Sequence, residues 1–180
     1  MNYYLNLLLR VLLCFIPFTV FYVIFLPLTL YSSYFLLSYW NPKIIEHSLL
    51  INGKYFLFIE ACVASVGYWL LWVLTWLIKD ASLKTRLKLI VTSFSLFFAM
   101  NIFRIVVLIL IDLYYGRATF DLVHIAMWKF VSGIYVAGVW IFCVKIYKIT
   151  SIPLYDDLKK IYRDSLFTRR GSGKSKGLQL

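Results

Sequence analysis

The sequence predicts an all-α transmembrane helical bundle of about four spans, with a short outer β-hairpin before the second span. Two observations predict the bundle: 62% of the 180 residues are hydrophobic while only 15% are charged, and the apolar residues gather in long runs. Soluble domains average about 45–50% apolar and about 25% charged residues. This chain has too few charges to cover a soluble surface, which excludes an ordinary cytosolic domain and a disordered chain. A third observation, Asn52-Gly53 between two apolar segments, predicts the hairpin.

Each predicted span matches the length needed to cross a membrane, about 20 mostly apolar residues for a hydrocarbon core of about 30 Å. Proline interrupts the first of them twice, at Pro17 and Pro27, which predicts a kink. Beyond Pro27, as far as Trp40, we expect the chain to lie in the membrane interface. The four expected spans are 7–30, 61–78, 89–111 and 124–147.

The chain divides into two parts by composition. Residues 1–150 form the multi-pass membrane domain, and residues 151–180 form a basic cytoplasmic tail. The end of this tail is rich in Gly, Ser, Lys and Arg, and we expect it to be disordered. The first apolar stretch, Val11–Tyr39, has no charged residue and is far longer than the core of a signal peptide, so we expect it to be retained in the membrane.

Lysine and arginine are distributed unevenly between the two sides of the predicted spans. Lys43, Lys54 and Arg117 fall on one side, Arg104 and Lys129 lie within spans, and the rest of the 19 basic residues fall on the other side. Because basic loops stay in the cytoplasm, both termini are expected there, in a multi-pass protein of the cell (inner or plasma) membrane. The net charge of +11 then reflects topology and contact with anionic membrane lipids, and we expect no nucleic-acid partner.

The outer β-hairpin is expected over residues 47–60. Two apolar runs, 48–51 and 54–59, flank Asn52-Gly53. Asn-Gly accepts positive φ at both central positions and is a strong signal for a two-residue hairpin. The hairpin leads directly into Glu60-Ala61-Cys62, and a rigid hairpin would hold Cys62 at the outer interface.

The cysteines indicate neither a disulfide framework nor a zinc site, because their number is odd and their spacing is not that of metal ligands. They are Cys14, Cys62 and Cys143. Cys14 and Cys143 lie inside long apolar runs, where a cysteine usually serves as a small buried hydrophobe. Cys62 differs because it lies at the edge of such a run. We expect no metal and no organic cofactor.

Three polar residues, Cys62, Arg104 and His124, are expected at one level of the membrane. Asn101 and Arg104 are three residues apart in the third span and therefore share a helix face. An arginine at the centre of a membrane helix costs about 2.5–3.5 kcal/mol, so Arg104 is expected to face the protein interior or a wet cavity. His124 opens the fourth span and Cys62 the second, both on the outer side. Topology alone therefore places Cys62, Arg104 and His124 within reach of one outer cavity.

These residue types suit thiol chemistry. A cysteine thiolate is a nucleophile whose pKa nearby cations lower. A histidine exchanges protons near neutral pH, and an arginine stabilises an oxyanion or binds a carboxylate. Each residue also has a plainer explanation. Cys62 would be an inert small side chain and His124 an interfacial one, and Arg104 would be a structural charge paired with Asp112 or Asp121.

Three short motifs together resemble the exosortase/archaeosortase family of multi-pass prokaryotic membrane proteins, which are implicated in processing C-terminal sorting signals of exported proteins. The motifs are Glu60-Ala61-Cys62 after a hairpin, Asn101-x-x-Arg104 in the next span, and His124 at the start of the last span. The resemblance covers residues 48–138. A glycine often follows the family's cysteine closely, whereas the next glycine here is Gly67. The chain would be a compact member.

The resemblance implies a membrane-embedded cysteine transpeptidase or protease that acts on the outer side of the membrane. Cys62 would attack a backbone carbonyl and form a thioester. Arg104 would stabilise the oxyanion and help keep Cys62 ionised, and His124 would protonate the leaving amine. An amine on a lipid or glycan, or water, would then accept the acyl group. The expected partners are exported proteins with a short C-terminal motif, a membrane helix and a basic end.

Three further residues are expected to support the site. Asn101 would orient Arg104 or the substrate backbone, Asp121 would hold the imidazole of His124, and Glu60 would cap the helix start or take part.

Two other functions fit the same residues. In a non-enzymatic transporter subunit or assembly factor, Arg104 would bind an anion or pair with an aspartate, and Cys62 would be replaceable. A different membrane enzyme would act on lipid or glycan through His124 and acidic residues. The junction of the hairpin with Cys62 favours the sortase-like function, because neither alternative needs it.

Overall fold

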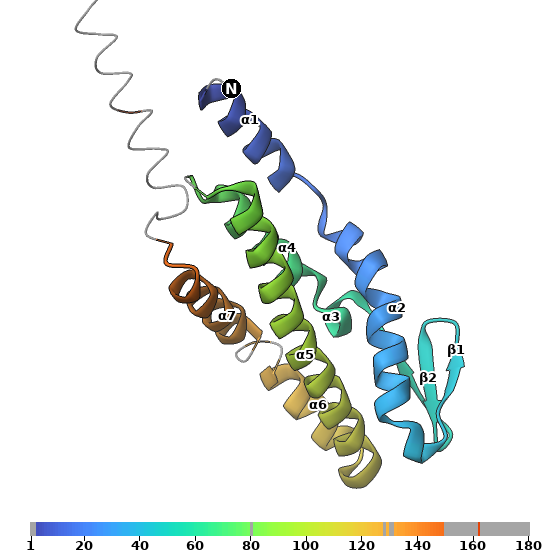
Figure 1. The fold of residues 1–180 in the computed structure, drawn as a ribbon. Coiled ribbons are helices and arrows are strands. Elements are labelled where there is room, and N and C mark those ends of the chain that lie inside the picture. Colours follow the sequence, from blue (N-terminus) through green and yellow to red (C-terminus); the bar gives the residue numbers. More distant parts are fainter. Residues whose placement is uncertain (1–2, 80, 128, 130–131, 150–161, 163–180) are drawn as a thin grey trace, which may run out of the picture.

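The computed structural model describes residues 3–79, 81–127, 129, 132–149 and 162. Within them, helices predominate and a small three-stranded sheet lies near one end of the bundle (Figure 1). Two helices are long and apolar enough to cross a membrane, α2 (Phe18–Leu36) and α5 (Leu83–Tyr115). The expected helical bundle is therefore present, whereas its division into four spans stays a prediction. The expected tail, 151–180, lies outside the described residues except for Tyr162.

The first expected span, 7–30, is divided between two helices in the structure, and its bounds in a membrane stay a prediction. Helix α1 (Tyr3–Cys14) ends before Pro17, and α2 begins directly after it. Proline disfavours a helical conformation in the residue before it and donates no backbone hydrogen bond, so the helix stops there. Pro27 lies inside α2, which continues to Leu36. The helix is therefore not interrupted at Pro27, whereas the expected place of the following residues in the membrane interface stays a prediction.

The sheet contains more than the expected hairpin. Strands β2 (Ser48–Ile51) and β3 (Lys54–Leu57) pair antiparallel, with Ile51 opposite Lys54. The turn between them consists of Asn52 and Gly53, whose φ angles of 49° and 77° are those that the Asn-Gly signal predicts. A further strand, β1 (Lys43–Ile45), pairs with β2 and was not expected. The 3-10 helix η1 (Ser38–Trp40) connects α2 to this sheet.

One face of the sheet packs against the helices. Leu49 and Ile51 of β2 are fully buried, and Phe56 and Phe58 lie on the same face. These side chains form one apolar cluster with residues of α2 and α5, among them Leu30, Ile105 and Ile109. Alternation of buried and exposed side chains therefore fixes the register of the hairpin against the bundle.

The second expected span, 61–78, is interrupted near its start. The short helix α3 (Glu60–Val63) and the apolar helix α4 (Ser65–Leu77) are separated by Ala64, which adopts a left-handed conformation with φ 59° and ψ 39°. Only glycine adopts this conformation without cost, so the surrounding contacts must hold Ala64 in place. The break separates Cys62 from the apolar helix that follows.

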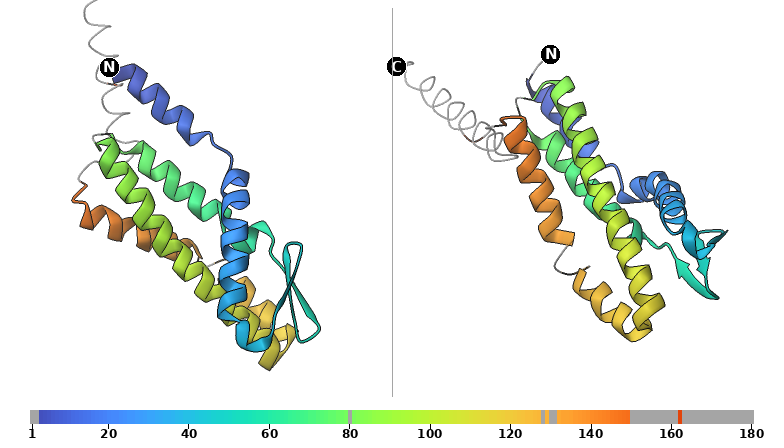
Figure 2. Two further views of the ribbon diagram at one scale, coloured as in Figure 1. Left: turned by 45° about the vertical axis from the view of Figure 1, so that its right-hand side comes forward. Right: turned by 60° about the horizontal axis from the view of Figure 1, so that its bottom comes forward.

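The expected start of the fourth span, 124–147, is wrong. Helix α6 (Arg117–Ala126) and helix α7 (Ser132–Ile146) are separate elements, and His124 lies in the last turn of α6. Gly116, with φ 83°, allows the chain to turn at the end of α5. Figure 2 shows α6 folded back beside the C-terminal part of α5. The third expected span, 89–111, lies within the longer α5.

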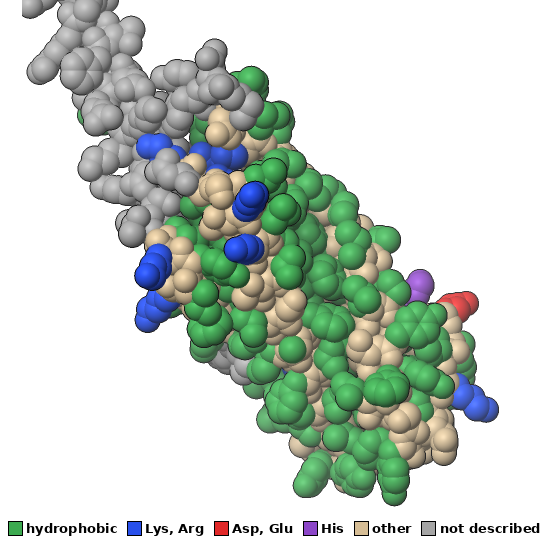
Figure 3. All heavy atoms as spheres, in the orientation of Figure 1, with side chains coloured by type: hydrophobic (Ala, Val, Ile, Leu, Met, Phe, Trp, Pro, Cys, Tyr) green, Lys and Arg blue, Asp and Glu red, His purple; other side chains and the backbone are tan. Residues whose placement is uncertain are grey.

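Basic side chains close the opposite end of the bundle. Arg10 donates to the carbonyl oxygens of Trp76 and Leu77 at 2.9 Å each, and Arg86 donates to that of Thr75 at 2.8 Å. These carbonyls lie in the last turn of α4, where cations compensate the helix dipole. On the face drawn in Figure 3, Lys and Arg side chains gather at this end, and hydrophobic side chains cover the middle.

Candidate functional site

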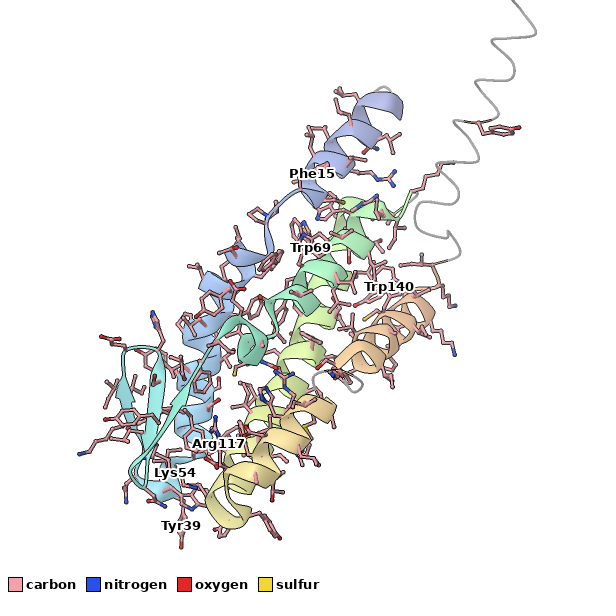
Figure 4. The ribbon with its side chains drawn as sticks, turned by 180° about the vertical axis from the view of Figure 1, so that it is seen from behind. Phe15, Tyr39, Lys54, Trp69, Arg117 and Trp140 are labelled. Carbon is pink, nitrogen blue, oxygen red and sulfur yellow. The ribbon has the colours of Figure 1, made fainter. Side chains whose placement is uncertain are left out.

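A cavity of about 290 Å³ lies between β3, α5 and α6. Its lining includes Cys62 from α3, Arg104 from α5 and His124 from α6, so the structure brings together the three side chains selected from the sequence. Ile105, Leu108 and Ile109 of α5 form an apolar part of the wall. In Figure 4, Lys54 and Arg117 lie close together at the sheet end of the molecule.

The side chain of Cys62 contacts the last residue of strand β3. The Cys62 backbone N–H donates to Ile59 O at 2.9 Å, and Cys62 Sγ contacts Leu57 O at 3.8 Å. Burial raises the pKa of the Cys62 thiol, and the backbone hydrogen bond with Ile59 and the charge of Arg104 lower this pKa by less. Arg104 lowers the pKa of Cys62, as expected, but the increase in this pKa caused by burial is larger. The resting side chain is a thiol.

Arg104 is 6% exposed and holds the loop that carries Cys62. Its Nη2 donates to Ala61 O at 2.9 Å and to Cys62 O at 3.0 Å, and its Nη1 donates to Ser132 Oγ at 3.1 Å. Its Nε–H is also buried and has no hydrogen-bond partner among the described residues. Within the residues that the structure describes, Arg104 forms no ion pair with Asp112 or Asp121.

Asn101 binds the same loop one turn earlier on α5. Its Nδ2 donates to Cys62 O at 3.1 Å and to Val63 O at 3.2 Å. The left-handed Ala64 ends α3 and leaves its carbonyls without helical partners, so Asn101 and Arg104 supply the missing donors. Asn101 therefore positions the cysteine loop together with Arg104, although the sequence suggested that it would orient Arg104 itself or the substrate.

His124 lies in the last turn of α6, and its ring centroid is 5.3 Å from that of Phe120. Burial and then the charge of Arg104 lower the pKa of His124, while Asp121 raises it and Arg117 lowers it further. The imidazole is therefore neutral near pH 7 and able to accept a proton. No hydrogen bond joins His124 to Cys62 within the described residues, although both line the same cavity.

Asp121 and Glu60 differ from their expected roles. Asp121 Oδ1 pairs with Arg117 Nε at 3.5 Å, and among the described side chains it forms no hydrogen bond with His124. Glu60 is the first residue of α3, whose N-cap is Ile59, so Glu60 does not cap the helix as an N-cap residue. Glu60 does not line the Cys62 cavity but a neighbouring hollow beside α7.

An ionic network joins the three elements around the cavity. The buried carboxylate of Asp112, near the end of α5, pairs with Lys54 of β3 at 3.6 Å and with Arg117 of α6 at 3.8 Å. Lys54 Nζ also donates to Asp112 O at 2.6 Å. The network holds the hairpin and α6 to the same end of α5, and so fixes both walls of the cavity.

Sequence reasoning missed several residues of this site. Arg117 and Phe120 line the cavity with Asp121 and His124, and the guanidinium of Arg117 lies 4.4 Å from the Phe120 ring centroid. Phe120, Asp121 and His124 follow Arg117 by three, four and seven residues, so all four side chains lie on one helix face. This spacing could have indicated from the sequence that residues 117–124 form a helix that lines the site. Ser132 was also missed, and its only signal is its place at the start of an apolar run.

Comparisons with models of protein families, with curated proteins and with solved structures found no significant match. Among the described residues, no group of three or more His, Cys, Asp or Glu side chains is arranged to hold a metal ion.

Proposed function

We propose that this chain is a membrane-embedded cysteine transpeptidase or protease that cleaves exported proteins at a C-terminal sorting signal. The observation that carries the proposal is the shared cavity of Cys62, Arg104 and His124, which come from three separate elements. The resemblance of the three motifs to the exosortase/archaeosortase family supports the same function. The substrates would be exported proteins with a short C-terminal motif, a membrane helix and a basic end.

The reaction begins with transfer of the Cys62 proton. Burial keeps both side chains uncharged at rest, so His124 is free to accept a proton. It takes the thiol proton as the sulfur attacks the substrate carbonyl, so that no separate thiolate has to form beforehand. A C–S bond forms, and the carbonyl oxygen becomes an oxyanion. The buried Nε–H of Arg104, which has no partner among the described residues, supports a role in stabilising this charge.

The tetrahedral intermediate then breaks its C–N bond. His124 returns its proton to the leaving amine, and Cys62 remains as a thioester. An amine on a lipid or glycan, or water, attacks the thioester carbonyl and releases the Cys62 thiol. Amine attack gives transpeptidation, and water gives hydrolysis.

We place the cavity on the outer side of a multi-pass protein whose termini are both cytoplasmic. Two features support this orientation. Arg10 and Arg86 bind the last turn of α4, at the end of the bundle away from the sheet (Figure 1), as the positive-inside rule requires of a cytoplasmic end. Large apolar side chains such as Val23, Val91 and Ile134 are exposed on α2, α5 and α7, which suits contact with lipid.

The decisive test replaces Cys62 with Ala in the native cell and follows candidate substrates that carry an apolar C-terminal helix with an Arg-rich end. We expect the shortened mature form to disappear and the precursor to accumulate. Cys14→Ala is the matched control, because Cys14 lies on α1 at the other end of the bundle, and it should leave processing intact. Normal processing in a well-expressed Cys62→Ala variant would refute the thiol mechanism and favour a non-enzymatic transporter subunit or assembly factor.

A further inference from the structure

Strand β3 is an edge strand of the sheet, because the strand order is β1-β2-β3. An edge strand presents unpaired backbone N–H and C=O groups on its outer side. In this protein, β3 borders the cavity that contains the candidate catalytic side chains.

The register shows which backbone groups point away from β2. Phe58 N–H donates to His47 O at 2.9 Å, so residues 47 and 58 form a hydrogen-bonded pair. Hydrogen-bonded pairs alternate with non-hydrogen-bonded pairs along an antiparallel ladder. Tyr55 and Leu57, opposite Leu50 and Ser48, are therefore in non-hydrogen-bonded positions, and their N–H and C=O groups point outward.

These outward groups face the cavity. Five consecutive residues, 55–59, line it, although alternate side chains of a strand point to opposite faces. Lining by residues of both faces fits a cavity that runs along the backbone edge of this segment. Among the described residues, no backbone partner is found for the N–H of Tyr55 or of Leu57.

The outer edge of β3 lies next to the candidate nucleophile, Cys62. Leu57 O, one of the outward carbonyls, is the group that Cys62 Sγ contacts at 3.8 Å. His124 and Phe120 lie on α6, which forms another wall of the same cavity. A backbone segment seated along β3 would therefore pass the thiol, with the imidazole in the same cavity.

We propose that the cavity binds its substrate as an extended peptide that adds to the sheet as a further strand beside β3. The proposal rests on the proposed function and specifies how the substrate is recognised. Backbone hydrogen bonds with Tyr55 and Leu57 supply affinity that depends little on sequence, and they deliver the scissile carbonyl to Cys62. Folded segments are excluded, because their backbone groups are already paired. Side chains that point toward Ile105, Leu108 and Ile109 should be apolar.

The test measures alkylation of Cys62 in the purified full chain in detergent, read by mass spectrometry of the Cys62 peptide. The probe is acetyl-tetraalanine chloromethyl ketone, and the reference is chloroacetone, which carries the same reactive group without a peptide. In both reactions the Cys62 sulfur forms a bond to the chloromethyl carbon, chloride leaves, and the thiol proton is released. The peptide should label Cys62 about 10-fold faster than chloroacetone, from about two added hydrogen bonds.

Two changes weaken this backbone pairing. Leu57→Pro removes one outward N–H without touching the β2 ladder, and an edge strand tolerates this proline. It should lower the ratio of the peptide labelling rate to the chloroacetone labelling rate about 3-fold, whereas Leu57→Ala, which keeps the N–H, should retain the peptide's advantage. A tetraalanine probe with N-methylated backbone amides should lose its advantage on the unaltered protein, so the test does not depend on folding of the proline variant.

The results separate this proposal from the proposed function. Equal labelling by both probes in the unaltered protein, or a full peptide advantage with N-methylated amides, would overturn binding at the β3 edge. The labelling needs no turnover, so a peptide advantage that is lost in Leu57→Pro supports the binding mode whatever the Cys62→Ala processing experiment shows.

Discussion

The loop that carries Cys62 depends on Arg104, and two substitutions separate the structural role of this arginine from its electrostatic role. Arg104 donates to Ala61 O at 2.9 Å, to Cys62 O at 3.0 Å and to Ser132 Oγ at 3.1 Å. Neither glutamine nor lysine reproduces this planar fork. We predict that Arg104→Gln loosens the loop and lowers the reactivity of the thiol, while Arg104→Lys loosens the loop but keeps the cation.

The structural cost follows from what each partner keeps. Cys62 O keeps its hydrogen bond with Asn101 Nδ2 at 3.1 Å, and Ser132 Oγ keeps its donation to Met127 O at 3.1 Å. Ala61 O loses its side-chain donor, and an unsatisfied buried acceptor costs about 1–3 kcal/mol. If the free energy of unfolding falls by about 2 kcal/mol, the unfolding temperature of a chain of this size should be about 4–8 °C lower in both variants.

Two assays on the purified chain in detergent measure the two roles. Thermal unfolding measures the loss of loop contacts, and the rate of Cys62 alkylation by chloroacetone at pH 8 measures the thiolate fraction. The charge of Arg104 lowers the pKa of Cys62, so its removal raises that pKa. Alkylation should be about 3- to 10-fold slower in Arg104→Gln and near the original rate in Arg104→Lys. Unchanged unfolding temperatures would refute the structural role, and an unchanged rate in Arg104→Gln would refute the electrostatic one.

Three further predictions concern packing and pH. Gly67→Ala places a Cβ against Cζ of the buried Phe97 ring and should destabilise the chain by about 1–3 kcal/mol, whereas Gly138→Ala, with open space around it, should be neutral or stabilising in the same unfolding assay. Because the pKa of Cys62 is raised, its alkylation rate should keep increasing with pH beyond the range of an ordinary thiol, and a midpoint below that range would contradict the buried thiol. Because the pKa of His124 is lowered, the imidazole stays neutral to a lower pH than an ordinary histidine, whose pKa is about 6.5, so substrate processing should persist at that pH. A loss of processing already above pH 6.5 would count against His124 as the base.

Local sequence predicted the features that depend on short-range backbone chemistry. Asn52-Gly53 indicated the turn between β2 and β3, because few residue pairs accept positive φ at both central positions. The spacing of Asn101 and Arg104 indicated a shared helix face, and both side chains indeed reach the same loop. The proline at position 17 indicated an interruption, although the sequence alone did not show that the helix would stop there and continue unbroken through Pro27.

Other features depend on contacts between distant segments and could not be predicted in this way. Ala64 has no residue-specific reason to adopt a left-handed conformation. It is held there because Asn101 and Arg104, about forty residues away in the sequence, bind the carbonyls that the break leaves exposed. Similarly, β1 has only three residues, too few for a strand signal in the sequence, and it becomes a strand because it pairs with β2.

The sequence by itself determined that the chain is apolar and helical, where its hairpin turns, and which few polar side chains are worth testing. Composition and helix periodicity are local properties, and they suffice for these conclusions. Only the tertiary structure decided that His124 belongs to a separate helix, that Arg104 holds the cysteine loop, and that the free edge of β3 borders the cavity. These features arise from packing between segments far apart in the chain, because a buried polar group must find a partner wherever the fold provides one.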